Sequence, residues 1–121
     1  MTKLLALATV LTIAAAPAVA SPAYKCQGDR VEKGGSTQFT IRRSGGEFSV
    51  EKGGSTKAKV VKRNSKLVVE VGGSSKAEIE NGKISKGGSS WANVSDAQKE
   101  FDCDGDVAAS LWVLFKLGVL P

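Results

Sequence analysis

The amino-acid sequence predicts a mainly β domain that ends in an α-helix (α+β). The expected architecture is an antiparallel β-meander of about eight short strands, built from hairpin repeats and packed on or around a buried C-terminal helix. Three observations support this prediction. A Gly-Gly-Ser motif recurs four times, apolar residues around each copy are spaced by two, and this spacing ends after Val94. A spacing of two is the period of a strand, and its loss marks the change to helix.

Residues 1–20 are interpreted as an export signal. Lys3 gives a positively charged start, an apolar stretch follows, and Ala18-Val19-Ala20 matches the small-residue site at which such signals are cleaved. Cleavage after Ala23 fits the same pattern. Residues 21–121 then form one small domain, and because the apolar stretch is too short to anchor the chain, we expect no membrane span in the mature protein. The expected location is periplasmic or secreted, in a bacterial-type cell.

The only cysteines are Cys26 and Cys103. An isolated pair in an exported chain most often forms a disulfide, and the C-x-x-C spacing of redox-active pairs is absent. Closing such a long loop removes unfolded-state entropy worth about 4.5 kcal/mol in the chain-entropy treatment. We therefore expect one stabilising disulfide.

Each Gly-Gly-Ser motif is interpreted as a three-residue hairpin loop, because glycine readily adopts the positive φ angles that such loops require. In this register apolar residues face one another on one side of the sheet, and unlike charges face one another on the other side. The repeats are Val31–Thr37, Val50–Thr56, Val69–Ser75 and Ile84–Ser90. The predicted apolar pairs are Val50–Ala58, Phe48–Val60, Val69–Ala77 and Leu67–Ile79, and the predicted charge pairs are Glu51–Lys57, Glu70–Lys76 and Lys66–Glu80.

Two-residue loops are expected between the repeats. They fall at Ser44-Gly45, Arg63-Asn64 and Asn81-Gly82, and they pair Arg42 with Glu47, Lys57 with Glu70, and Glu80 with Lys83. A solenoid of parallel coils is the alternative, but these hairpin signals favour the meander. The pattern fits an open sheet and a closed barrel equally.

A short helix is expected over residues 96–101, with Ser95 and Gln98 as its capping box. A second helix is expected over residues 107–117, capped by Asp106. Gly118 follows it, where a left-handed residue ends many helices.

The second helix is apolar on nearly all sides, so it must be buried. The apolar face of the sheet needs a cover, and the small side chains of Ala58, Ala77 and Ala92 allow close approach. Core packing is therefore favoured over a membrane role for residues 111–120. Tyr24 and Trp91 are interpreted as packing residues.

The formal net charge is +5, with the positive charge concentrated in the first half of the domain. Five cations have no partner in the predicted register and form a candidate basic patch for an anionic envelope polymer or an acidic protein. They are Arg43, Lys52, Lys59, Lys62 and Arg63. Nucleic acid is not an expected partner, because the interleaved exposed aromatic residues of a base-stacking surface are missing.

We expect no enzymatic activity, cofactor or metal. The chain has no histidine, which removes the commonest general base and a common metal ligand. Asp102, Asp104 and Asp106 are spaced like the start of a calcium loop, but Val107 and Val113 stand where glycine and glutamate are required. Helix capping accounts for these carboxylates instead.

The segment Tyr24-Lys25-Cys26-Gln27-Gly28, followed by a small β-rich domain with a distant second cysteine, resembles exported inhibitors of c-type lysozyme. That resemblance implies a small barrel that inserts a loop with Ser and Lys into the lysozyme cleft. It covers these five residues and the general layout. The chain has no matching Ser-Gly-x-x-Tyr segment, so no site residue is assigned from the resemblance.

The expected function is that of an exported, non-catalytic binding or inhibitory module of the cell envelope. The alternatives are a structural envelope protein without a specific ligand and a lysozyme-inhibitor-like protein.

Replacing both cysteines (Cys26→Ser with Cys103→Ser) is expected to lower the free energy of unfolding by a few kcal/mol, because the unfolded chain gains freedom. The strand pairing is expected to persist. Chemical denaturation and amide hydrogen exchange measure the two effects, and an unchanged melting temperature would show that the bridge contributes nothing.

Overall fold

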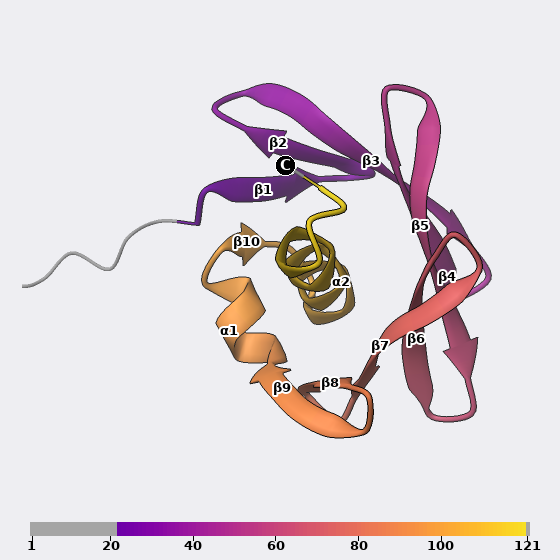
Figure 1. Ribbon diagram of the computed structural model, residues 1–121. Helices are drawn as coiled ribbons and strands as arrows, with labels where there is room; N and C mark the ends of the chain where they lie inside the picture. The colour runs from indigo at the N-terminus through magenta and orange to yellow at the C-terminus, as the bar shows by residue number, and fades with distance from the viewer. Residues whose placement is uncertain (1–21, 121) are drawn as a thin grey trace, which may run out of the picture.

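The computed structural model describes residues 22–120, which form one sheet of ten strands that curls around a single long helix (Figure 1). Strands β1 to β9 follow one another as antiparallel neighbours, and β10 pairs in parallel with the outer edge of β1. The predicted α+β class with a β-meander is confirmed. The parallel strand was not predicted, because a strand of two residues leaves no periodic signal.

The strands are β1 (Tyr24–Gln27), β2 (Arg30–Lys33), β3 (Ser36–Ser44), β4 (Glu47–Lys52), β5 (Ser55–Arg63), β6 (Lys66–Val71), β7 (Ser74–Glu80), β8 (Lys83–Lys86), β9 (Ser89–Asn93) and β10 (Phe101–Asp102). The helices are α1 (Val94–Gln98) and α2 (Gly105–Lys116). The hydrogen-bonded order runs from β10 to β9 and does not close, so the sheet is open, and α1 lies in the gap between its two edges (Figure 1).

Each repeat turns on two glycines rather than on the predicted three residues. Lys52 pairs with Ser55 across Gly53 and Gly54, whose φ angles are +60° and +82°. Positive φ at both positions is the requirement of a type I′ turn, whose twist matches that of the flanking strands. The same two-residue geometry recurs at the other three repeats.

A β-bulge follows each Gly-Gly turn. One extra residue stands in the strand after the turn, so two residues oppose one on the partner strand. The extra residues are Gln38, Lys57, Lys76 and Trp91. A bulge bends its strand and increases the local twist. Four bulges at equivalent positions therefore account for the curl of the sheet.

The bulges explain why the predicted apolar pairs are correct and why the predicted charge pairs of Glu51 and Glu70 are wrong. A two-residue turn plus one bulged residue gives the same count as a three-residue loop, so Val50–Ala58 and Leu67–Ile79 form as expected. Between the turn and the bulge the register differs by one residue. Glu51 therefore faces Thr56 instead of Lys57, and Glu70 faces Ser75 instead of Lys76. Lys66 lies beyond the bulge, where the register set by Leu67–Ile79 is as predicted, but its ammonium group forms an ion pair with Glu78 rather than with Glu80.

Of the predicted two-residue loops, only Asn81-Gly82 is correct, and it pairs Glu80 with Lys83. The other two lie one residue further along, at Gly45-Gly46 and Asn64-Ser65. Consequently Arg42 faces Ser49 rather than Glu47, and Glu70 faces Lys59 rather than Lys57.

Both helices begin earlier than predicted. Asn93 is the N-cap of α1, and its backbone N–H donates to the Asp96 carboxylate, so the expected Ser95 and Gln98 capping box is wrong. Asp104 rather than Asp106 caps α2, by accepting a hydrogen bond from the backbone N–H of Val107 at 3.0 Å. Both aspartates suit this role chemically, and the prediction chose the later one.

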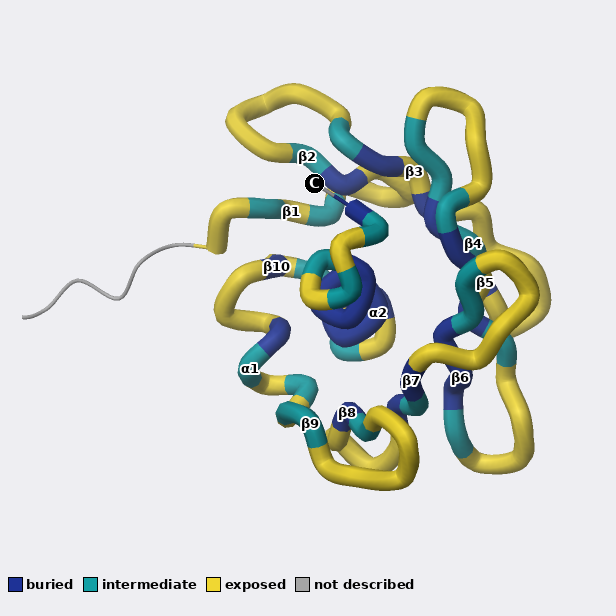
Figure 2. Tube along the Cα trace, in the orientation of Figure 1, coloured by how far each residue is buried: buried dark blue, intermediate teal, exposed yellow. Residues whose placement is uncertain are grey.

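Helix α2 occupies the core, as predicted. Residues 107–114 are buried without interruption, and the inward-facing residues of the strands surround them (Figure 2). Ala58 and Ala77 lie in this core, whereas Ala92 is only partly buried. The hydroxyl of Ser110, the one buried polar side chain in the described part of the chain, donates to the backbone carbonyl of Asp106 at 2.8 Å. The sheet and the helix thus bury each other.

The predicted disulfide is present between Cys26 in β1 and Cys103, which lies between β10 and α2. It ties the first strand to the residue next to the helix cap. A disulfide is typical of proteins outside the reducing cytosol.

Trp112→Ala is expected to lower the free energy of unfolding by about 3 to 5 kcal/mol, the cost typical of removing a buried aromatic side chain. Trp112 is 8% exposed and packs edge-on against Trp91 at 5.0 Å. Urea unfolding followed by circular dichroism measures the loss. A mutant that unfolds at the same urea concentration as the parent would show that α2 does not hold the core together.

Candidate functional site

The five cations of the predicted basic patch do not gather at one place. Arg43 and Lys62 extend the inward-facing rows of their strands at the end where α2 begins, and Lys52 extends such a row at the opposite end. Lys59 and Arg63 alternate with buried neighbours and lie on the outer face. Two of the five also have partners, which the sequence did not predict.

The end of the sheet where α2 begins carries charges of both signs that are already paired. Arg43 lies 3.4 Å from the Asp104 carboxylate and 3.5 Å from that of Asp29. A hollow of about 380 Å³ lies beside this pair, and a second hollow of about 290 Å³ shares Gly46 and Asp106 with it. Because acidic and basic groups alternate around these hollows, neither hollow favours a ligand of one charge.

The opposite end of the sheet has a ring of four lysines. Each ammonium group stands over the face of an aromatic ring, at 5.0 to 5.7 Å from the centroid. The pairs are Lys33 over Tyr24, Lys52 over Phe39, Lys86 over Trp91 and Lys116 over Trp112. Cation–π attraction holds each lysine against the ring beneath it.

The four rings converge on the last turns of α2. Tyr24 and Phe39 both contact Phe115, with centroids 5.3 and 5.8 Å away, and Trp91 contacts Trp112 at 5.0 Å. The lysines that cover these rings therefore surround the C-terminal half of the helix.

The repeat itself places three of these lysines. Lys33, Lys52 and Lys86 each stand two residues after a fully buried core residue of the same strand (Val31, Val50 and Ile84). Residues two apart share a face, so each lysine stem continues the inner face just beyond the edge of the core. In the third repeat the equivalent residue is Val71, which packs against the core and stays partly exposed.

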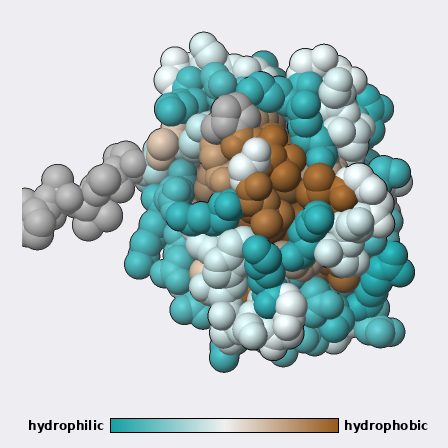
Figure 3. All heavy atoms as spheres, viewed as in Figure 1, coloured by the Kyte–Doolittle hydropathy of each residue, from teal (hydrophilic) through white to brown (hydrophobic). Residues whose placement is uncertain are grey.

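Apolar side chains fill the centre of the ring. Phe115, Leu117 and Val119 are partly exposed, like Val71. Figure 3, which looks at this end along α2, shows a contiguous hydrophobic area surrounded by hydrophilic residues. We call the four lysines (Lys33, Lys52, Lys86 and Lys116) and the four central residues (Val71, Phe115, Leu117 and Val119) the lysine-rimmed apolar end.

The backbone after α2 fixes the centre of this surface. Gly118, with φ +77° as predicted for it, donates its N–H to the carbonyl of Phe115 at 3.1 Å, and Val119 donates to the carbonyl of Leu114 at 2.9 Å. These two bonds form a Schellman motif, which folds the chain back across the helix end. Leu120 is thereby buried, and Val119 lies at the surface.

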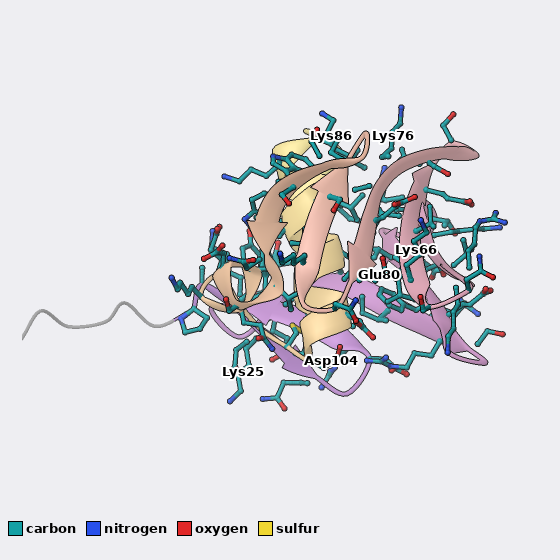
Figure 4. All side chains as sticks on the ribbon, turned by 90° about the horizontal axis from the view of Figure 1, so that it is seen from below. Lys25, Lys66, Lys76, Glu80, Lys86 and Asp104 are labelled. Carbon is teal, nitrogen blue, oxygen red and sulfur yellow. A yellow bond between two sulfur atoms is a disulfide. The ribbon has the colours of Figure 1, made fainter. Side chains whose placement is uncertain are left out.

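The rim lysines form no ion pair within 4 Å in the part of the chain that the structure describes. By contrast, two outer-face arginines pair closely with carboxylates: Arg42 with Glu51 at 3.0 Å and Arg63 with Glu70 at 3.1 Å. Figure 4 shows Lys86 and Lys76 at one end of the molecule and Asp104 toward the other. The lysine-rimmed apolar end can therefore offer four unneutralised ammonium groups and an apolar contact to the same ligand.

Only Lys52 belongs both to the predicted patch and to this surface. The predicted patch was chosen as the cations that had no partner in the predicted register, and that register was wrong for the charged face of the sheet. The usable signal was position: a lysine two residues after a core valine or isoleucine, directly before a Gly-Gly turn. Tyr24 and Trp91 do pack as expected, and they also support rim lysines.

No known protein family, curated protein or solved structure was found to match this chain. Within residues 22–120, no helix combines the length and apolarity needed to cross a bilayer.

Replacing any one rim lysine by glutamine is expected to change the free energy of unfolding by less than about 1 kcal/mol, because a cation–π contact at an exposed site contributes only that much. Lys86→Gln is the clearest case, since the Trp91 beneath it reports unfolding by fluorescence. A loss of several kcal/mol would instead identify the lysines as structural and would argue against a binding role.

Proposed function

We propose that this protein is an exported, non-catalytic binding module of the cell envelope and that the lysine-rimmed apolar end is its binding surface. The observation that carries the proposal is the arrangement of four unpaired lysines around partly exposed apolar residues at the end of the buried helix. A contiguous exposed apolar area with a charged border is typical of interaction sites in small domains.

The charge distribution supports a negatively charged ligand. Outer-face ion pairs such as Arg42–Glu51 serve solubility without attracting a particular partner. Within the described residues the rim lysines have no ion pair, and unlike the equally unpaired Lys59 and Lys83 they surround an apolar area, so they combine attraction for an anionic partner with an apolar contact. The disulfide and the leader sequence support export, although the leader lies outside the described residues.

The proposal is tested by capture from an envelope extract separated into lipid, polymer and protein fractions. The immobilised protein, with its disulfide intact, is expected to retain anionic material at low salt and to release it at high salt, because exposed charges are screened. A rim variant with Lys33, Lys52, Lys86 and Lys116 each replaced by Gln is expected to lose this retention.

The matched control has Lys25, Lys59, Lys62 and Lys83 each replaced by Gln. It carries the same change in charge, but at lysines outside the rim that also have no ion pair within 4 Å in residues 22–120. It is expected to retain what the wild type retains. No retention at low salt would refute a binding role, and equal retention by the rim variant would refute this surface.

A further inference from the structure

We infer that the lysine-rimmed apolar end docks on an anionic lipid bilayer, with α2 upright and its C-terminal end toward the lipid. This inference rests on the proposed binding function and names its ligand. The occupant is the bilayer surface itself, which presents phosphate groups in one layer and acyl chains directly beneath them.

The layering of the surface matches that of a bilayer interface. The apolar residues Leu117 and Val119 lie at the centre of the end, and the lysines stand around them. A flat interfacial site places apolar side chains at the acyl boundary and ammonium groups at the phosphates, and the long stems of lysine let both happen together. A protein interface shares this apolar centre with a polar rim, so the bilayer is distinguished by the partly exposed Tyr24 and Trp91 beneath the rim lysines.

Aromatic residues with a polar atom add to this match. Tyr24 and Trp91 are partly exposed, and each lies beneath a rim lysine. Tyrosine and tryptophan favour the headgroup level of a bilayer, where the ring contacts apolar groups and the polar atom stays hydrated. The rim therefore combines the two residue classes that anchor proteins at this depth.

Charge along the α2 axis favours one orientation. Asp104 and Asp106 stand at the first turn of the helix, and Glu47 lines the hollow beside them. Anionic lipids attract the lysine end, whereas at the other end acidic groups offset the cations, as Asp104 does for Arg43, and the attraction is weaker. The rim lysines are also free to approach phosphates without first breaking an ion pair.

A bilayer fits this surface better than a single enclosed amphiphile does. Four well-formed hollows on the described surface are lined by other residues, and none of these four includes Phe115, Leu117 or Val119. The apolar centre is thus displayed at the helix end, which suits contact with an extended surface.

Vesicle co-sedimentation tests the inference with the full mature protein. We expect binding to vesicles of phosphatidylcholine mixed with phosphatidylglycerol and little binding to phosphatidylcholine alone. Each lysine near an anionic surface strengthens binding roughly fivefold, so the rim variant is expected to bind at least a hundredfold more weakly. The control variant loses the same net charge, and this general loss of attraction is expected to weaken its binding by no more than roughly threefold relative to the wild type.

Tryptophan fluorescence gives an independent readout of orientation. Trp91 and Trp112 are the only tryptophans, and both lie at this end. Lipids brominated near the top of the acyl chain are expected to quench the wild type on mixed vesicles. Leu117→Ser with Val119→Ser is expected to reduce quenching and binding roughly tenfold while leaving the circular dichroism spectrum unchanged.

Three outcomes would overturn the inference. Failure of the wild type to bind mixed vesicles excludes the bilayer, and if the rim lysines still direct capture from the extract, the proposed binding function survives with another ligand. Equal vesicle binding by the rim and control variants assigns the attraction to overall charge. Rim-dependent dimers in sedimentation, without vesicle binding, assign the surface to a second copy of the chain.

Discussion

The mutual burial of a curved sheet and an apolar helix is the constraint on which the rest of this structure depends. Helix α2 is apolar on nearly every side, so one flat sheet face would leave much of it in water. The bulge in each repeat bends the sheet far enough to enclose the helix, and Val107 to Leu114 become buried. The same enclosure ends where the helix ends, and this is why Phe115, Leu117 and Val119 stay partly exposed.

Much of this architecture could be predicted from periodicity. Pairs such as Leu67–Ile79 followed from keeping apolar residues on one face, and this criterion is insensitive to whether the extra residue sits in the loop or in a bulge. Pairs such as Glu70–Lys76 are sensitive to that difference, because Lys76 is itself the bulged residue. Strand β10 could not be predicted, since its position is set by pairing with β1 and not by a local pattern. The start of α1 was misplaced because Asn93 and Ser95 are both residue types that cap helices, and Asn93 does so.

The candidate site was predicted less well than the fold, for a related reason. A cation without a partner is an informative signal only when the register around it is right, and Arg43 and Arg63 turned out to have partners at Asp104 and Glu70. Three of the rim lysines are placed by their spacing from a buried residue of the same strand. The sequence repeat shows this spacing, for example in Lys33, which stands two residues after Val31. Lys116 lies one helical turn after Trp112, so the predicted helix already implied their contact, but only the structure shows that Lys116 is level with the strand ends.

The two borders of the open sheet have a consequence for behaviour in concentrated solution. On one side the outermost strand is the two-residue β10, beside which the Cys26–Cys103 bridge fastens β1, and on the other side the chain turns from β9 directly into α1, which packs against it. Short or occupied borders offer few unpaired amide groups to another molecule. This arrangement protects a mainly β chain against the edge-to-edge pairing that leads to fibrils.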